Sequence, residues 1–284
     1  MPKLELINWF FLSNAATSST SNEELASLSE QLLKNDINNA ANLISVNVQG
    51  RVSDGNKNDK APKRLLTVDS RAWSIPTISR LRLLFNNFVP DVRKSENVTS
   101  IEKAEENNFL DAILDTPIME KTQSFLAHKG YISHDRTIFK EALYDLWFSL
   151  YPRGKGELGS SGIEHVFLGE LKNGKVSGFH NWVFFNNEEL QQFADYLGFI
   201  QDVDLGSKGH VLKFTFKWRN TYKPVGTMFI GTSPELELAL YTICYLTRPN
   251  QMCRLKLGGH PVSIQTYQLS YNGKSYVASA FPTL

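Results

Sequence analysis

The chain has 284 residues, of which 42% are hydrophobic and 21% charged, a composition that excludes an intrinsically disordered protein. Its formal net charge is only +1, which argues against tight, sequence-independent binding along a long phosphate backbone, because that affinity comes from many Lys and Arg contacts. A local site for a short stretch of nucleic acid is compatible with this charge.

Residues 1–20 are expected to form an N-terminal extension. Lys3 followed by the apolar run 8–12 faintly resembles a secretion leader, although Glu5 interrupts it and the run is short. No stretch approaches the roughly 18 apolar residues of a membrane span. The glycosylation sequon at Asn97 is of a kind that occurs often by chance, so the compartment, secreted or intracellular, is left open.

Residues 21–152 predict a mainly helical lobe. The leucines within 21–34 recur on one helical face, and the polar stretch 48–64 is typical of an exposed loop. The block 99–150 predicts three helices, of which the first is capped by Thr99 or Ser100. The second begins at Thr116-Pro117 and ends near Gly130, and the third covers 139–151.

Residues 153–284 predict a β-rich lobe that follows the Gly-rich connector 152–162. Two strands, 163–171 and 175–185, are expected to form a hairpin. A helix with a capping box is predicted from Asn186 to Gly198. The remaining expected elements are strands 210–218 and 224–231, a helix from Ser233-Pro234, and three terminal strands with a turn at Asn272-Gly273.

This order of elements predicts an α+β fold, with the helical lobe packed against a lobe of antiparallel sheets and interleaved helices. The two cysteines, Cys244 and Cys253, are too few for a disulfide scaffold and form no CxxC motif. Free thiols are favoured over a bridge between them, although both readings stay open.

Two of the six histidines stand out, because His165 and His180 would face each other across the predicted hairpin. Two imidazoles that close can hold different protonation states near neutral pH and flank a reacting phosphate. The alternatives are two core histidines or half of a metal site. The other histidines are expected to be solvated, namely His128, His134, His210 and His260.

Glu164 and Glu170 share strand parity with each other and are therefore predicted to point away from His165. They could hold a divalent ion, orient other groups or be exposed carboxylates. Lys223 precedes a proline and would ordinarily be a solvated turn residue. It matters for chemistry only if the fold brings its ammonium to the histidines, where it could stabilise charge on a phosphorane.

Three segments, SSGIEHVFLGE, VSGFHNWVFF and KPVGTMFIGTSPELELALYTICYL, resemble the EndoU family of uridylate-specific endoribonucleases. The resemblance extends upstream through FLDAIL, PIM and LWFSLYPR, and downstream through SIQTY to the end of the chain. It implies that the active site lies in a groove between the lobes, with catalytic residues His165, His180 and Lys223. It also implies that Glu164 and Glu170 account for a dependence on manganese, or on calcium instead.

The resemblance implies cleavage of single-stranded, uridine-rich RNA on the 3′ side of uridines, leaving a 2′,3′-cyclic phosphate. The family carries a Thr/Ser-x-Tyr-Pro motif, which here reads SAFP, so Ser279 and Phe281 take its place. Phe281 keeps a stacking face and loses the hydroxyl, and Thr227 is a further residue expected to read the base. A monomer is expected. The alternatives are an RNA-binding protein that does not cleave, and a secreted protein that acts through a partner.

Overall fold

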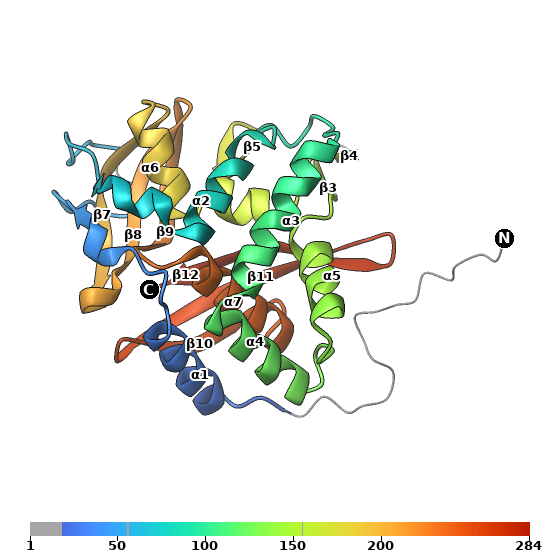
Figure 1. The fold of residues 1–284 in the computed structure, drawn as a ribbon. Coiled ribbons are helices and arrows are strands. Elements are labelled where there is room, and N and C mark those ends of the chain that lie inside the picture. The colour runs from blue at the N-terminus through green and yellow to red at the C-terminus, as the bar shows by residue number, and fades with distance from the viewer. Residues whose placement is uncertain (1–18, 56, 155) are drawn as a thin grey trace.

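The structure is a computed structural model that describes residues 19–55, 57–154 and 156–284. The leader-like run lies outside these residues. The described chain has the predicted α+β class (Figure 1). The helices are α1 (Asn22–Lys34), α2 (Pro76–Leu83), α3 (Ser100–Leu114), α4 (Pro117–His128), α5 (Arg136–Trp147), α6 (Trp182–Leu190) and α7 (Pro234–Thr247). None of these is long and apolar enough to cross a bilayer.

The strands of the described chain form small antiparallel sheets. The short ones are β1 (Ile44–Val46), β2 (Leu66–Val68), β3 (Pro152–Gly154), β4 (Glu157–Leu158), β5 (Glu170–Lys172) and β6 (Lys175–Ser177). The long ones are β7 (Ala194–Asp204), β8 (His210–Trp218), β9 (Thr221–Ile230), β10 (Met252–Leu257), β11 (His260–Tyr271) and β12 (Lys274–Thr283).

Local capping explains where the N-terminal helices begin. Ser21 and Thr99 each accept a hydrogen bond from the third residue of their helix and complete a capping box, as the sequence pattern suggests for Thr99. Thr116 caps α4, with a proline in its first turn as predicted. Helix α5 begins three residues earlier than predicted because the Asp135 side chain accepts from the amides of Thr137 and Ile138.

Helix α7 is buried on almost every side and forms the centre of the molecule. Helix α4 packs on it from one side and strand β11 from the other. The indole of Trp147 at the end of α5 donates to the hydroxyl of Thr242 on α7, at 3.0 Å. Helices from the first half and the sheet from the second half therefore share one hydrophobic core.

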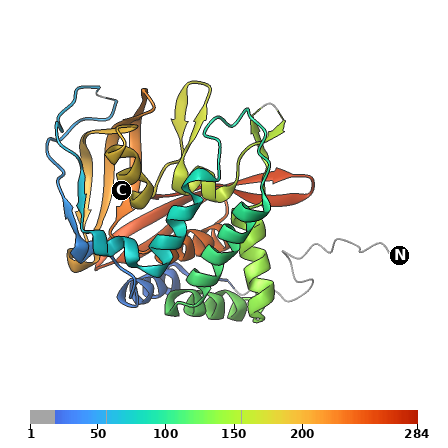
Figure 2. The ribbon, with the colours of Figure 1, turned by 45° about the horizontal axis from the view of Figure 1, so that its top comes forward.

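Two three-stranded sheets, in the orders β7-β8-β9 and β10-β11-β12, dominate the described second half. Strand β9 of the first sheet adjoins β12 of the second, and β9 also contacts β6. Figure 2 shows the β10-β11-β12 sheet with α1 and α4 on one side and the β5-β6 hairpin on the other. The junction of β6, β9 and β12 brings the segment after β6 close to Lys223 on β9 and Ser279 on β12.

The predicted strands 163–171 and 175–185 are wrong over most of their length. Residues 164–168 form a π-helical turn, and only the short strands β5 and β6 remain, joined by the turn predicted at 172–174. Residues 163–170 are all buried, so they lack the alternation that separates a strand from a helix. Glu164 lies on the π-helical turn and Glu170 on β5, so strand parity does not relate the directions of the two side chains.

The predicted helix from Asn186 to Gly198 is also wrong. Helix α6 begins earlier because the side chain of Asn181 accepts from the amides of Val183 and Phe184. Strand β7 then starts at Ala194, where the sequence was expected to be helical. The strands 210–218 and 224–231, the helix after Ser233 and the three terminal strands are confirmed with small shifts.

The expectation of free thiols is corrected, because Cys244 and Cys253 form a disulfide. A short turn after α7 brings the chain back into β10, so the two Cα atoms lie 5.5 Å apart. That separation lies within the range that a disulfide spans. Both cysteines are fully buried.

Candidate active site

The first part of the site is the π-helical turn η4 (Glu164–Leu168). Its closing hydrogen bond runs from the amide of Gly169 to the carbonyl of Glu164, at 2.6 Å. Single π-helical turns are rare and recur at functional sites. This one places His165 in the interior, with only 4% of the residue exposed.

The second part is the backbone of residues 178–180, which runs beside η4. The amide of Phe179 donates to the carbonyl of His165 at 2.9 Å, and the amide of His180 donates to that of Val166 at 2.7 Å. A Cβ on Gly178 would lie 1.7 Å from the His165 carbonyl oxygen, so only glycine fits there. Phe179 has φ +71°, a costly conformation for a non-glycine residue. These contacts lie beyond the ends of the short β5-β6 hairpin and bring the two histidines together as predicted.

His165 is held by a carboxylate through one ring nitrogen. Its Nδ1 lies 2.7 Å from Oε2 of Glu170, and its Nε2 lies 3.2 Å from the hydroxyl of Ser279. Because a carboxylate only accepts, Nδ1 carries a hydrogen and Nε2 is the atom that can gain or release a proton. Burial lowers the pKa of His165 to about 4, helped by the charge of Arg153 and opposed by Glu170.

Glu170 is 1% exposed and is surrounded by donors. Arg153 Nε lies 3.0 Å from Oε2, and the Ser160 hydroxyl donates to Oε1. Burial alone would raise the pKa of Glu170, but His165, Arg153 and Ser160 outweigh it and hold the pKa below its usual value. Glu170 is therefore a buried, charged carboxylate behind His165, which corrects the prediction that it points away.

His180 is held through the same ring nitrogen as His165, but its partner is a backbone carbonyl and not a carboxylate. Its Nδ1 donates to the carbonyl oxygen of Thr227 at 2.6 Å, which leaves the lone pair of Nε2 free. Burial, with the charge of Lys223, holds the pKa of His180 well below its usual value. The ring of Phe281 stacks on the imidazole at a centroid distance of 5.0 Å and an interplanar angle of 16°.

Lys223 lies on β9 and is 8% exposed, so it is not the solvated turn residue that its local sequence suggests. Its ammonium donates to the carbonyl of Gly178, two residues before His180. Burial lowers the pKa of Lys223 to about 7. Its charge also lowers the pKa of both histidines, so His165, His180 and Lys223 lie within electrostatic range of one another.

The residues expected to read the base surround this group. Ser279 contacts His165, and Phe281 contacts His180. The hydroxyl of Thr227 is buried and has no hydrogen-bond partner among the described residues. An unpaired buried hydroxyl is costly, and a ligand that supplies a partner would remove that cost.

A sequence profile of the family described as Endoribonuclease XendoU matches residues 24–282. The chain belongs to this family. It is 41% identical over 268 residues to the uridylate-specific endoribonuclease of Bos taurus, covering 91% of this chain and 65% of that one. It is 39% identical over 276 residues to uridylate-specific endoribonuclease D of Xenopus laevis, covering 94% and 90%. The chain thus spans slightly less than two thirds of the bovine relative.

The structure agrees with this assignment. The solved structure of XendoU, a splicing-independent snoRNA processing endoribonuclease, superposes with a TM-score of 0.77 at 33% sequence identity. The superposition covers 94% of this chain and 98% of XendoU. The resemblance seen in the sequence motifs and the predicted fold class are therefore both confirmed.

The metal site implied by the XendoU family resemblance does not fit Glu164 and Glu170 in this chain. Burial, together with Glu96, raises the pKa of Glu164 well above its usual value, which disfavours the ionised carboxylate that a metal ion requires. Both oxygens of Glu170 already bind donors from the protein. The described residues contain no cluster of three or more His, Cys, Asp or Glu that could hold a metal ion.

Two site residues of this XendoU family member were missed from sequence, Arg153 and Ser160. Both lie in the connector that was expected to be a loop, and their contacts with Glu170 depend on the fold. Of the remaining histidines, His128, His134 and His260 are exposed as expected. His210 differs, because its Nδ1 lies 3.0 Å from Asp202 and this ion pair raises its pKa.

Proposed function

We propose that this protein is an endoribonuclease that cleaves single-stranded RNA on the 3′ side of uridines. The ribose 2′-oxygen attacks the adjacent phosphorus, a bond forms between them, and the bond from phosphorus to the 5′-oxygen of the next nucleotide breaks. The products are a 2′,3′-cyclic phosphate and a 5′-hydroxyl. The observation that carries the proposal is a pair of buried histidines with differently fixed Nδ1 atoms, beside one buried lysine.

His180 is the general base. With Nδ1–H bound to the Thr227 carbonyl, its Nε2 has a free lone pair. The low pKa keeps the ring neutral at pH 7, so Nε2 is available to accept the proton of the 2′-hydroxyl. A second neutral histidine alone would not complete the reaction, because the leaving 5′-oxygen needs a proton.

His165 is the general acid that supplies this proton from Nε2. The Glu170 carboxylate behind Nδ1 stabilises the imidazolium, as the buried Asp does for the His of serine proteases. In the free protein, burial favours the neutral ring. The negative charge of a bound phosphate raises the pKa of His165 and draws the proton to Nε2.

Lys223 stabilises the negative charge that develops on the non-bridging phosphate oxygens. An ammonium in a water-poor site is worth more there than in bulk water. It must be protonated to act, and its pKa of about 7 places the loss of that charge close to neutral pH. This dependence gives the pH prediction in the Discussion.

Uridine selection is assigned to Phe281, Ser279 and Thr227. The ring of Phe281 supplies a face on which a base can stack. The hydroxyl of Ser279 contacts His165, and Thr227, whose backbone carbonyl accepts from His180, has a buried hydroxyl that is unpaired among the described residues. They are the groups available to bind the polar edge of uracil.

Manganese, or calcium in its place, takes no part in these steps, because the nucleophile is in the substrate and the glutamates are otherwise engaged. A divalent ion is proposed to act by helping the polyanionic RNA to bind. The site is complete within one chain, so the protein is proposed to act as a monomer, which size-exclusion chromatography with light scattering tests.

The experiment uses an oligonucleotide with a single uridine between a fluorophore and a quencher. His165→Ala and His180→Ala are each expected to lower kcat by at least about 100-fold, the usual contribution of a general acid or base. His134→Ala, an exposed histidine, is the matched control and should cleave normally. Full activity in either active-site variant would contradict the assignment. Tight RNA binding without cleavage by the unaltered protein would favour the non-cleaving alternative.

A further inference from the structure

The sheet β10-β11-β12 has two unlike faces. One face is apolar and covered by helices α1 and α7. Its members alternate along the strands and include Cys253, Leu255, Leu257, Val262, Ile264 and Ala280. The other face, here called the open face, carries Met252, Arg254, Lys256, Gln265, Tyr267 and Phe281.

The strand register makes the open face continuous with the candidate active site. Tyr267 lies directly opposite Ser279, whose hydroxyl contacts His165. Gln265 lies opposite Phe281 on one side and opposite Met252 on the other. Directly paired residues point to the same face of an antiparallel sheet. The open face therefore begins at the catalytic histidines and extends across β11 to β10.

Aromatic rings lie where the open face meets the candidate active site. Phe281 stacks on His180, and Tyr267 stacks on Phe281 at a centroid distance of 6.3 Å and an interplanar angle of 28°. Tyr267 is 49% exposed, which is unusual for so large a side chain at the edge of a buried site. Its position in the stack offers a flat surface to the nucleotide next to the scissile phosphate.

Positive charge marks the other end. Arg254 and Lys256 are exposed, and neither forms an ion pair with a described residue. From residue 238 to the C-terminus the sequence contains four Lys or Arg and no Asp or Glu, although the whole chain has a net charge of only +1. The open face therefore carries a local excess of positive charge. Its own strands contain no acidic side chain.

We propose that the open face binds the RNA strand that flanks the cleaved uridine, with Tyr267 stacking on a neighbouring base and Arg254 and Lys256 binding phosphates farther along. This inference rests on the proposed function and deepens it. Stacking aromatics beside a basic groove are what single-stranded nucleic acids bind. The chemistry fits RNA better than a protein partner because the charge and the rings form one path that leads out of the active site.

The spacing suits a short strand. Neighbouring strands are about 4.8 Å apart and residues along a strand rise about 3.4 Å, so Arg254 lies roughly 12 Å from Phe281 along the sheet. A stacked nucleic-acid strand rises about 3.4 Å per nucleotide, so this distance corresponds to roughly three to four nucleotides. A substrate that has a uridine and no flanking nucleotides is too short to reach these contacts.

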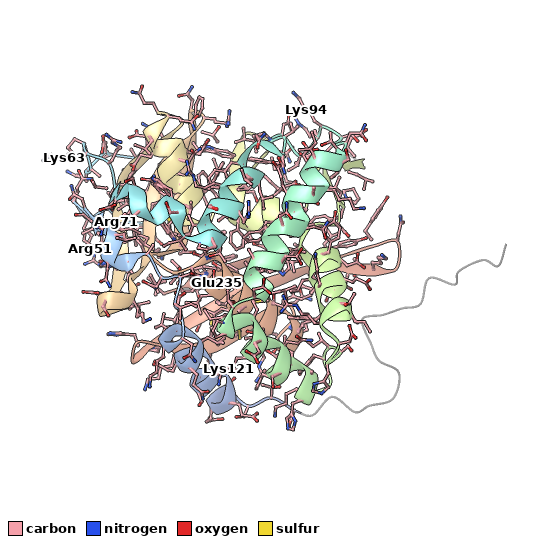
Figure 3. The ribbon with its side chains drawn as sticks, in the orientation of Figure 1. Arg51, Lys63, Arg71, Lys94, Lys121 and Glu235 are labelled. Atoms are coloured by element: carbon pink, nitrogen blue, oxygen red, sulfur yellow. A yellow bond between two sulfur atoms is a disulfide. The ribbon has the colours of Figure 1, made fainter. Side chains whose placement is uncertain are left out.

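The test compares two substrates. One is a long oligonucleotide with a single uridine, and the other is uridine 3′-(4-nitrophenyl phosphate), which undergoes the same 2′-oxygen attack and releases 4-nitrophenolate. The variant is Arg254→Gln/Lys256→Gln. The matched control is Lys34→Gln/Lys121→Gln, which removes the same charge from α1 and α4 on the covered side of the sheet (Figure 3).

The Arg254→Gln/Lys256→Gln variant is expected to lose about tenfold in kcat/KM on the long substrate at low salt. The slope of log kcat/KM against log salt concentration should become shallower by about 1.4, because each of the two lost phosphate contacts to a single strand contributes about 0.7. The nitrophenyl ester should be cleaved as by the unaltered protein, and the control pair should behave normally on both substrates. An unchanged rate and salt slope on the long substrate would overturn the proposal.

Tyr267 is tested separately. Tyr267→Ala is expected to lower kcat/KM on the long substrate by roughly tenfold or more, the effect of losing one base–aromatic stack. Tyr267→Phe should restore most of it, because the ring remains. Equal loss in both variants would overturn the stacking role. If the unaltered protein cleaves neither substrate, the proposed function is wrong. If it cleaves both substrates and the open-face variants have no effect, only the proposal for the open face is wrong.

Discussion

Oε2 of the Glu170 carboxylate lies 2.7 Å from Nδ1 of His165, and both side chains are almost completely buried. In the proposed mechanism Glu170 is therefore a positioning residue for the general acid, and both of its oxygens already bind donors from the protein. Arg153 and Ser160 hold the carboxylate in turn. The local sequence, in which the two carboxylates seemed to face away from the histidines, gave the opposite expectation.

Glu170→Gln should lower kcat by roughly 100-fold, because the imidazolium of His165 loses its counter-charge. Glu164→Gln is the matched control, since burial and Glu96 raise the pKa of this carboxyl and disfavour its charged form, so its kcat should change little on replacement by a neutral amide. The measurement is kcat with and without saturating manganese, together with thermal unfolding. If kcat fell equally in both variants and saturating manganese restored it, the two glutamates would hold a metal ion after all.

The pH profile should carry the signature of Lys223. Its lowered pKa means that the ammonium is charged below about pH 7 and neutral above it. Above pH 7, kcat/KM should therefore fall by about an additional factor of ten for each pH unit. In Lys223→Arg, where the guanidinium stays charged, that extra slope should disappear. A profile of the unaltered protein without a break near pH 7 would remove Lys223 from this role.

Phe281 should affect both rate and selectivity. Phe281→Ala removes a stacking face and exposes His180, so kcat/KM on a single-uridine oligonucleotide should drop roughly 5- to 100-fold. Phe281→Tyr keeps the ring and adds a hydroxyl near the base, so the ratio of uridine to cytidine cleavage should rise. Matched oligonucleotides with one uridine or one cytidine provide the measurement. A Phe281→Ala variant with normal rates on both would contradict a substrate role.

The disulfide gives a prediction about stability. Replacing Cys244 and Cys253 together by alanine should lower the free energy of unfolding by about 2 to 3 kcal/mol, the loop-closure effect expected for so short a loop. The site does not include either cysteine, so kcat should stay the same. Urea unfolding and a thiol titration of the denatured protein without reductant provide the test. Two titratable thiols would show that the bridge does not form.

Local sequence signals predicted the parts of the fold that have local causes. The caps at Thr99 and Thr116, the turn at Asn272-Gly273 and the helix after Ser233 all depend on neighbouring residues, and all are present. The π-helical turn at 164–168 has no such local signal, because its residues are all buried and do not alternate. The early start of α6 does have a local cause, the Asn181 cap, which was not recognised in the sequence.

For the candidate site too, some features could be predicted from the sequence and others depend on the fold. The proximity of His165 and His180 was inferred from a hairpin of two long strands, but the observed β5-β6 hairpin is short and includes neither histidine. A backbone contact between Phe179 and His165 brings them together instead. The motif resemblance correctly placed Lys223 beside them, which spacing alone did not. Arg153 and Ser160 carry no motif of their own, because their role depends on where the connector packs against Glu170.

The central claim is that the RNA itself supplies the nucleophile. It is tested most directly with a DNA oligonucleotide that contains one ribouridine, and with the same oligonucleotide carrying 2′-deoxyuridine at that position. The account predicts a single cut after the ribouridine, with a 2′,3′-cyclic phosphate and a 5′-hydroxyl identified by mass spectrometry, and no cut in the deoxy version. Cleavage of the deoxy version, or a product with a 5′-phosphate, would contradict it.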